Sequence, residues 1–220
     1  MDLPDWLQPL ADAARAVRPQ DLSRFLPPDD GSGRPSAVLM AFADTADGPG
    51  VLLIERAADM RTHAGQVAFP GGATDPDDPH AVATALREAE EEVGLDPSTV
   101  HIVAQLPALY LPPSGFVVSP VLAWWTAPHE VSPVDAAEVA RVAVVPVRAL
   151  ADPANRFRVS HPSGLVGPGF EVAGLFVWGF TAGLLDHLLR LGGWAQPWDE
   201  ARIRPLPAGN SGLRPRPPAS

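Results

Sequence analysis

Residues 65–95 of the chain read GQVAFPGGATDPDDPHAVATALREAEEEVGL and predict a short strand, a glycine turn and one helix. Pro79 suits the first helical position, where its missing N–H would have no partner, and Asp78 suits the N-cap. Gly94 suits the residue after the helix, because a left-handed conformation is needed there. The sequence therefore predicts a helix that begins near Pro79 and ends before Gly94.

The expected helix has an apolar side and an acidic side. The apolar residues recur at spacings of 4, 3 and 4 and form one stripe: Val82, Leu86, Ala89 and Val93. The acidic side carries Glu88, Glu91 and Glu92 at positions i, i+3 and i+4, so we expect their carboxylates to converge. Like charges at this spacing cost about 0.2–0.5 kcal/mol per pair, so a cation bound between them would stabilise them.

A hard divalent cation would fit this acidic side. Mg²⁺ and Mn²⁺ prefer carboxylate oxygens and share their remaining positions with water and substrate phosphates. Arg87 precedes Glu88 and could hold one glutamate by a bidentate pair. A merely solvated acidic face is the other interpretation. The preceding Gly71-Gly72 turn and the defined helix start favour the metal site.

The second half of the stretch, REAEEEVGL at residues 87–95, resembles the Nudix box, which reads R-E-apolar-x-E-E-x-G-apolar there. Every defined position of that half matches. The first half departs from the pattern, because the usual glutamate and glycine positions fall on Pro79 and Ala73 and the loop is one residue longer. We expect Asp78 to replace the first acid, whose role in the family is largely structural.

The segment upstream is similar to the pattern of the coenzyme A diphosphatase subgroup of Nudix hydrolases, which is LLTxR followed by R-x-x-x-G and FPGG. The matching residues are LLIER at 52–56 (with Ile54 in place of threonine), Arg61, Gly65 and FPGG at 69–72. The resemblance implies an α/β/α sandwich around a mixed β-sheet. It also implies hydrolysis of coenzyme A, or a derivative, to 3′,5′-ADP and 4′-phosphopantetheine or its acyl form.

The resemblance implies a metal centre. Glu88, Glu91 and Glu92 would hold one or more Mg²⁺ or Mn²⁺ ions, with the backbone carbonyl of Gly72 as a further ligand. Arg87 would belong to the same catalytic group. One of these carboxylates, or one from another loop, would orient the attacking water as general base.

The resemblance also implies a substrate site. Arg56 and Arg61 would contact phosphates, with surface salt bridges as the alternative. Gly65 and Gln66 would complete the site, since a glycine lets the backbone approach a ligand closely. His63 could assist, although a loop histidine is more often only exposed or packed.

Two further residues have open interpretations. Glu138 begins an expected strand, at a place where many Nudix proteins carry an acidic residue near the metals, but a solvated strand end is an equal alternative. Tyr110 could stack on a base, as an aromatic near this place does in other Nudix subgroups. A half-buried strand tyrosine is the favoured interpretation.

Composition excludes several classes of protein. The net charge of −10 argues against a nucleic-acid partner, because such binding needs a basic surface, and it requires a local cation to attract an anionic small-molecule substrate. The absence of cysteine excludes disulfides, a thiol nucleophile and a cysteine zinc site.

The chain shows no secretory signal and no apolar run long enough for a membrane helix. We therefore expect a cytoplasmic protein without a membrane partner. A homodimer is compatible with the resemblance.

The remaining pattern predicts one domain with extensions. We expect an N-terminal helical extension and linker at residues 1–33, the hydrolase domain at 34–193, and a Pro-rich, partly disordered tail at 194–220. Strands are expected at 37–43, 51–55, 66–69, 100–106, 116–125 and 138–147, a Pro-rich loop at 109–115, a hairpin at 156–178, and further helices at 4–17, 22–26 and 180–191. This mixed order fits the α/β/α sandwich.

Two rival functions stay open beside coenzyme A hydrolysis. The first is a Nudix hydrolase of ADP-ribose, NADH or a nucleoside triphosphate, which would not need the upstream arginines Arg56 and Arg61. The second is a non-catalytic Nudix-fold ligand sensor. Such sensors usually lose the glutamates, which are all present here.

Overall fold

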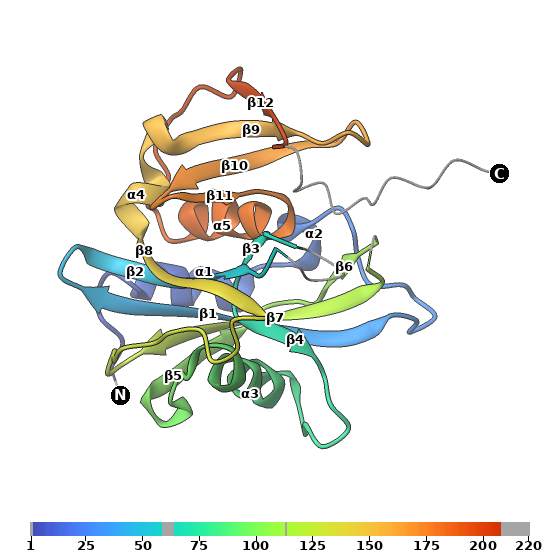
Figure 1. Cartoon of the computed structure of the whole chain (residues 1–220), viewed down its shortest axis with the longest axis vertical. Coiled ribbons are helices and arrows are strands. Elements are labelled where there is room, and N and C mark those ends of the chain that lie inside the picture. The colour runs from blue at the N-terminus through green and yellow to red at the C-terminus, as the bar shows by residue number, and fades with distance from the viewer. Residues whose placement is uncertain (1, 59–63, 113, 208–220) are drawn as a thin grey trace.

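A mixed β-sheet forms the centre of the computed structural model, which describes residues 2–58, 64–112 and 114–207 (Figure 1). The described residues give this sheet eight strands, with the path β3-β2-β1-β7-β5 and with β4, β6 and β8 attached to β1, β7 and β2. β1 and β7 run parallel, and the other pairs are antiparallel. The strands are β1 (Arg34–Thr45), β2 (Gly48–Arg56), β3 (Val67–Ala68), β4 (Gly71–Ala73), β5 (Val100–Gln105), β6 (Leu109–Leu111), β7 (Phe116–Trp125) and β8 (Val139–Pro146).

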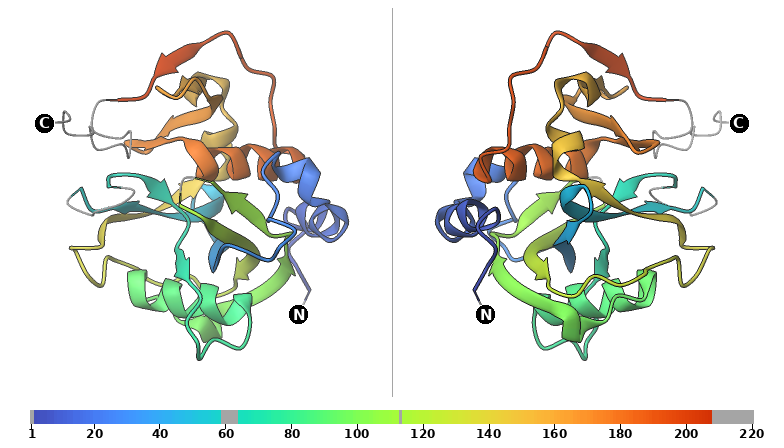
Figure 2. Two further views of the ribbon diagram at one scale, coloured as in Figure 1. Left: turned by 90° about the vertical axis from the view of Figure 1, so that its right-hand side faces the viewer. Right: turned by 90° about the vertical axis from the view of Figure 1, so that its left-hand side faces the viewer.

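Helices cover both faces of this sheet (Figures 1 and 2). α3 (Ala81–Val93) lies on one face, and α1 (Gln8–Ala16) and α5 (Gly179–Leu191) lie on the other. The predicted α/β/α sandwich around a mixed sheet is therefore confirmed. Short helical segments complete the connections: α2 (Pro19–Leu22), α4 (Val147–Ala151), and the 3₁₀ turns η1 (Pro97–Thr99) and η2 (Pro153–Asn155).

A second, smaller sheet packs on the far side of α5 (Figure 1). Its described strands run in the order β11-β10-β9-β12. They are β9 (Arg156–Ser160), β10 (Val166–Val172), β11 (Leu175–Val177) and β12 (Ile203–Pro205). The hairpin expected at 156–178 is thus part of a larger unit. Residues 203–205, expected to be irregular tail, pair in parallel with β9. The tail from residue 208 lies outside the described residues.

Successive side chains of β1 point to opposite faces of the sheet and belong to two separate parts of the core. Leu39 and Ala41 pack with α3, whereas Met40 and Phe42 pack with α1 and α5. A fully buried leucine contributes about 1.5–3 kcal/mol to folding. On the α3 side many contacts are made by alanines, Ala85 among them, and small side chains let the helix lie close to the sheet.

The ends of α3 confirm one part of the sequence prediction and correct another. Gly94 has φ 70°, the expected left-handed conformation. The helix begins at Ala81, and its N-cap is His80, whose ring accepts a hydrogen bond from the Ala83 amide at 3.1 Å. The prediction of Asp78 as N-cap was wrong, because Asp78 is bonded to a side chain of the helix instead.

Most other helices and strands begin and end within a few residues of the positions expected from the sequence, and three expectations differ from the structure. In the apolar stripe of α3, Ala89 and Val93 are buried but Val82 and Leu86 are half-buried, and Ala85 is fully buried. The loop expected at 109–115 contains β6, which pairs with β7. The short helix expected at 22–26 lies at 19–22 instead. None of the described helices is long and apolar enough to cross a membrane.

Two tryptophans fasten the segments before β1 and directly after α5 to the central sheet. The Trp194 ring lies 5.9 Å from the Phe42 ring of β1 and 6.4 Å from the Trp6 ring. The Trp6 indole N–H donates to Asp44 at 2.8 Å. The segments before β1 and after α5 therefore stabilise each other through the sheet.

We expect Trp194→Ala to lower the free energy of unfolding by about 2–3 kcal/mol, because it removes an aromatic contact shared by both end segments. Urea denaturation followed by circular dichroism measures this change. Ile203→Ala is the control, since Ile203 is 54% exposed and should change stability by less than about 0.5 kcal/mol. Equal effects of the two substitutions would contradict the role given to Trp194.

Candidate functional site

The face of the sheet that packs with α3 also carries the predicted site. Ile54 of β2 packs toward α3, and Arg56, two residues later, points to the same side and reaches Glu92, with 3.4 Å between Nη1 and Oε1. Gly72 of β4 lies directly against Glu88: a Cβ atom at Gly72 would be 2.5 Å from that carboxylate. The structure thus brings Arg56, Gly72, Glu88 and Glu92 together.

Glu92 is a buried carboxylate. Its side chain is 5% exposed, and its Oε2 accepts a hydrogen bond from the Gly71 amide at 2.9 Å. The pKa of Glu92 is raised to about 7, chiefly by burial and also by the charges of Glu88 and Glu138, while the Gly71 amide and Arg56 act in the opposite direction. The negative charge of Glu92 is therefore only partly compensated by the protein.

Gly71 had no role of its own in the sequence prediction beyond the glycine turn. Its φ of 155° is in the region that favours glycine, and a Cβ atom there would lie 2.3 Å from the carbonyl oxygen of Ala37. Only glycine can bring this amide so close to β1 and still donate to Glu92. The Gly-Gly pair was the available signal, but its hydrogen bond to Glu92 depends on the packing of α3.

Glu88 is less buried than Glu92. Burial raises the pKa of Glu88, and the positive charge of Arg87 opposes that effect. Glu88 and Glu92 are one helical turn apart, so both carboxylates face the Gly71-Gly72 segment.

Glu91 does not converge with these two glutamates. It is 60% exposed and pairs with Arg87 one turn earlier, with 2.9 Å between Oε2 and Nη1. Over the described ranges no group of three or more histidine, aspartate or glutamate side chains is assembled as a metal cluster. The expected convergence of all three carboxylates is thus wrong for this conformation. A ligand role for Glu91 stays a prediction.

Arg87 connects the helix to the loop that precedes it. Its Nε and Nη2 donate to the two carboxylate oxygens of Asp78 at 3.1 and 2.9 Å, and Nη2 also donates to the carbonyl of Ala73 at 3.1 Å. The prediction that Arg87 holds a glutamate is confirmed for Glu91, at 2.9 Å, and Arg87 also lies 3.2 Å from Glu88. Its bidentate partner, however, is Asp78, so that part of the prediction was wrong. Hydrogen bonding to Arg87 holds the pKa of Asp78 well below its usual range. Asp78 thereby ties the longer loop to α3, in agreement with its expected structural role.

The predicted substrate residues are partly described. Gly65 has φ 65°, and its amide donates to the Arg56 carbonyl at 3.1 Å. The Gln66 carbonyl accepts from the Arg56 amide at 3.0 Å, so both residues adjoin Arg56. Arg61 and His63 lie outside the described residues, and their roles stay predictions.

Two residues with open interpretations are described. Glu138 is exposed, its carbonyl accepts from the Ala57 amide at 2.9 Å, and its charge raises the pKa of Glu92. Tyr110 is a half-buried residue of β6 opposite Val117, which agrees with the favoured strand interpretation.

These residues fit a Mg²⁺ or Mn²⁺ ion. Glu88 and Glu92 offer the hard oxygen donors that such ions prefer. Burial disfavours the charged form of both, and a buried carboxylate is stabilised when a cation pairs with it. The missing side chain at Gly72 lets the Glu88 carboxylate lie directly against the backbone of β4.

Comparisons with known proteins give a consistent result. The profile described as the NUDIX domain matches residues 33–163. The uncharacterized Nudix hydrolase NudL of Citrobacter koseri is 38% identical over 162 residues, covering 70% of this chain and 81% of the relative. NudL of Cronobacter sakazakii is 40% identical with the same coverage. A crystal structure of the Nudix hydrolase RenU from M. smegmatis matches with a TM-score of 0.53 at 19% identity, covering 76% of this chain and 90% of that one, and supports the fold alone.

We expect Asp78→Asn to loosen the loop before α3, because the neutral amide cannot form the charged bidentate pair with Arg87. Hydrogen exchange followed by mass spectrometry should show the amides of Thr74 and Asp78 exchanging at least about tenfold faster. Asp77→Asn is the matched control, because Asp77 is exposed. Unchanged protection in the Asp78 variant would show that the pair does not hold the loop.

The buried Glu92 predicts a pH dependence of stability in metal-free protein. The folded state keeps the Glu92 proton up to a pH of about 7, whereas an unfolded glutamate releases it near pH 4.3, so the free energy of unfolding falls as pH rises between these values. Relative to Glu92→Gln, wild type should lose about 2–3 kcal/mol between pH of about 5 and about 8. Urea denaturation with a chelator present measures the difference.

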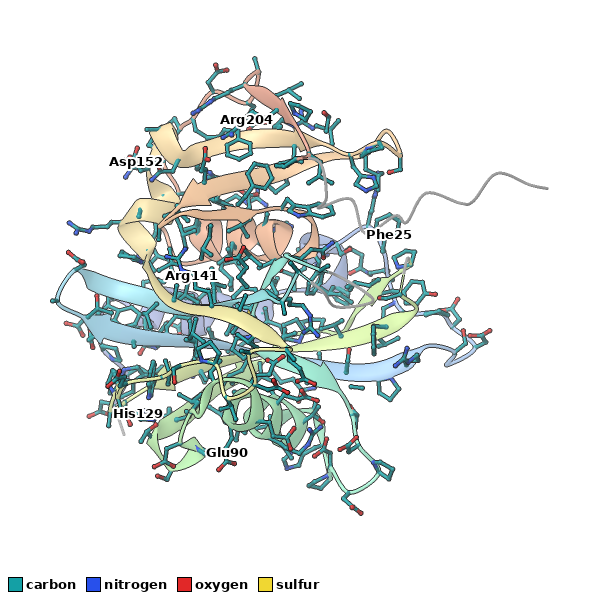
Figure 3. All side chains as sticks on the ribbon, in the orientation of Figure 1. Phe25, Glu90, His129, Arg141, Asp152 and Arg204 are labelled. Carbon is teal, nitrogen blue, oxygen red and sulfur yellow. The ribbon has the colours of Figure 1, made fainter. Side chains whose placement is uncertain are left out.

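The control for this prediction is Glu90→Gln. Glu90 is an exposed residue of the same helix and points away from the sheet (Figure 3), so its removal should leave a profile parallel to that of wild type. If the Glu92 profile also ran parallel to wild type, the carboxylate would not titrate in the way its burial implies.

Proposed function

The chain belongs to the Nudix hydrolase family, whose members act on phosphoric anhydrides, and from that premise we propose that it cleaves the diphosphate of coenzyme A or a derivative. The products would be 3′,5′-ADP and 4′-phosphopantetheine or its acyl form. The observation that supports metal-dependent hydrolysis is the pair Glu88 and Glu92, held against Gly71-Gly72 with Arg56 beside them.

In this proposal Glu88 and Glu92 hold Mg²⁺ or Mn²⁺, with Glu91 and the Gly72 carbonyl as further ligands. When bound, a divalent ion neutralises phosphoryl charge and makes a coordinated water a better nucleophile. The Gly71 amide fixes the Glu92 carboxylate, and Arg87 fixes the loop that carries Gly72. The general base is one of these carboxylates or Glu138, whose charge acts on Glu92.

Arg56 and Arg61 bind substrate phosphates in this proposal, and Gly65 and Gln66 form the adjoining wall. Arg56 supports this assignment because its side chain is 23% exposed and lies next to the glutamates. Coenzyme A offers a diphosphate and a 3′-phosphate, so two arginines have separate partners. Guanidinium groups suit such oxygens because their planar donors match two of them at once.

The choice of coenzyme A depends on the upstream pattern, LLIER with Arg61, Gly65 and FPGG. A hydrolase of ADP-ribose or NADH would use the same metal residues with a different wall. A non-catalytic sensor is disfavoured by the intact glutamates, since buried Glu92 destabilises the fold unless it is used.

A product assay tests the proposal. We expect the full-length protein with Mg²⁺ or Mn²⁺ to form 3′,5′-ADP from coenzyme A or acetyl-coenzyme A with a higher kcat/KM than it shows for NADH or ADP-ribose. A chelator should abolish this turnover. Glu92→Gln should lower kcat by at least about 100-fold, because it removes a charged metal ligand.

Glu90→Gln is the matched control and should retain wild-type activity, because Glu90 faces solvent on the same helix. A preference for ADP-ribose or NADH would keep the metal site and reject coenzyme A. Full activity of Glu92→Gln would reject the metal assignment. Absence of any metal-dependent turnover would favour the sensor.

A further inference from the structure

The backbone of Arg56 is fixed on both sides. Its amide donates to the Gln66 carbonyl at 3.0 Å, and its carbonyl accepts from the Gly65 amide at 3.1 Å. The next amide, of Ala57, donates to the Glu138 carbonyl at 2.9 Å. The pairing of β2 with β8 also shifts register between Glu55 and Arg56. The backbone at Arg56 is therefore held in place, so a change of partner would need movement of the side chain alone.

That guanidinium makes a loose contact with Glu92. A single Nη1 atom lies 3.4 Å from Oε1, whereas charged N–H···O bonds are about 2.7–2.9 Å long. Arg56 Nε is buried, and the part of the chain that the structure describes offers it no acceptor. Arg87 differs, because its two bonds to Asp78 are 2.9 and 3.1 Å long. Arg56 is close enough to compensate Glu92, but it is not bound to it in the bidentate way.

Glu92 does not depend on Arg56 for its position. Its other oxygen, Oε2, accepts the Gly71 amide at 2.9 Å, and the carboxylate is enclosed between α3 and β4. Oε1 is thus the oxygen that faces a positive charge already present, the guanidinium of Arg56 at 3.4 Å. A divalent ion bound to Oε1 would repel the guanidinium, because both are positive at short range.

We propose that Arg56 is an exchangeable counter-cation, which pairs with Glu92 in the metal-free protein, yields Oε1 to the divalent ion and then turns to a substrate phosphate. This inference rests on the proposed function, because it takes Glu92 as a metal ligand. It adds an order of events: the metal binds before the substrate phosphate engages Arg56. It also gives an acceptor to Nε, for which the described residues offer none, since a phosphate presents oxygens to Nε and Nη together.

The test is Mn²⁺ binding to the full-length, substrate-free protein, measured by isothermal titration calorimetry. Arg56→Gln should bind Mn²⁺ at least about threefold more tightly than wild type, because the competing positive charge is gone. Arg56→Lys keeps that charge and should stay close to wild type. A pH of about 8.5 keeps protons from competing with the metal. A merely structural role would have the opposite sign, since a disturbed site binds metal more weakly.

Arg148→Gln is the control for net charge. Arg148 is 69% exposed and pairs with Asp47 in the turn between β1 and β2, at the other end of β2 from Arg56. Its removal should leave Mn²⁺ affinity unchanged.

At saturating Mn²⁺, Arg56→Gln should also lower kcat/KM for coenzyme A at least about tenfold, as the phosphate contact is lost. Circular dichroism confirms that each variant is folded.

The measurements distinguish failure of this inference from failure of the proposed function. Equal or weaker Mn²⁺ binding by Arg56→Gln, with normal binding by wild type, would overturn the counter-cation role and leave the proposed function standing. Undiminished kcat/KM in that variant would overturn the exchange to phosphate. If wild type and Glu92→Gln bound Mn²⁺ equally well, the metal assignment itself would be wrong, and this inference would fall with it.

Discussion

The hydrogen bond between the Gly71 amide and the buried carboxylate of Glu92 is the interaction on which the site depends. It joins the last turn of α3 to the first residue of β4, and it holds a charged group where water is largely excluded. A carboxylate in such a place is costly unless it is paired. The surrounding residues therefore supply one fixed amide and one loosely bound guanidinium, and the remaining charge favours a metal ion.

That interaction requires α3 to lie close to the sheet. Alanines on the facing surfaces, such as Ala85 on the helix and Ala37 and Ala41 on β1, allow this approach. Gly72 allows it on the side of β4, since a Cβ atom there would clash with Glu88, and Gly71 lets β4 lie close to Ala37 of β1. Small residues in the core thus determine where the acidic side chains of the helix end up.

Local pattern was sufficient for the mixed order of strands and helices and for the end of α3 at Gly94, and the family resemblance indicated that Glu88 and Gly72 belong to one site. It was not sufficient where long-range pairing decides. The strand at 203–205 pairs with β9 across more than forty residues, and no local period indicates that contact. Asp78 looked like an N-cap from its position, yet a carboxylate gains more from a bidentate arginine nine residues away. The direction of Glu91 depended on the same arginine.

The two arginines at the site, Arg56 and Arg87, differ in how firmly their positive charges are held. In a chain of net charge −10, glutamates that hold a metal would by themselves repel an anionic substrate. Arg87 cannot relieve this repulsion by moving, because two bonds to Asp78 and one to Ala73 commit it to the loop. Arg56 has one long contact and a backbone that is fixed, so in the proposed exchange its positive charge would pass from carboxylate to phosphate without any change in the fold. Under that proposal, the difference in contact geometry makes Arg87 a structural residue and Arg56 a group that exchanges partners.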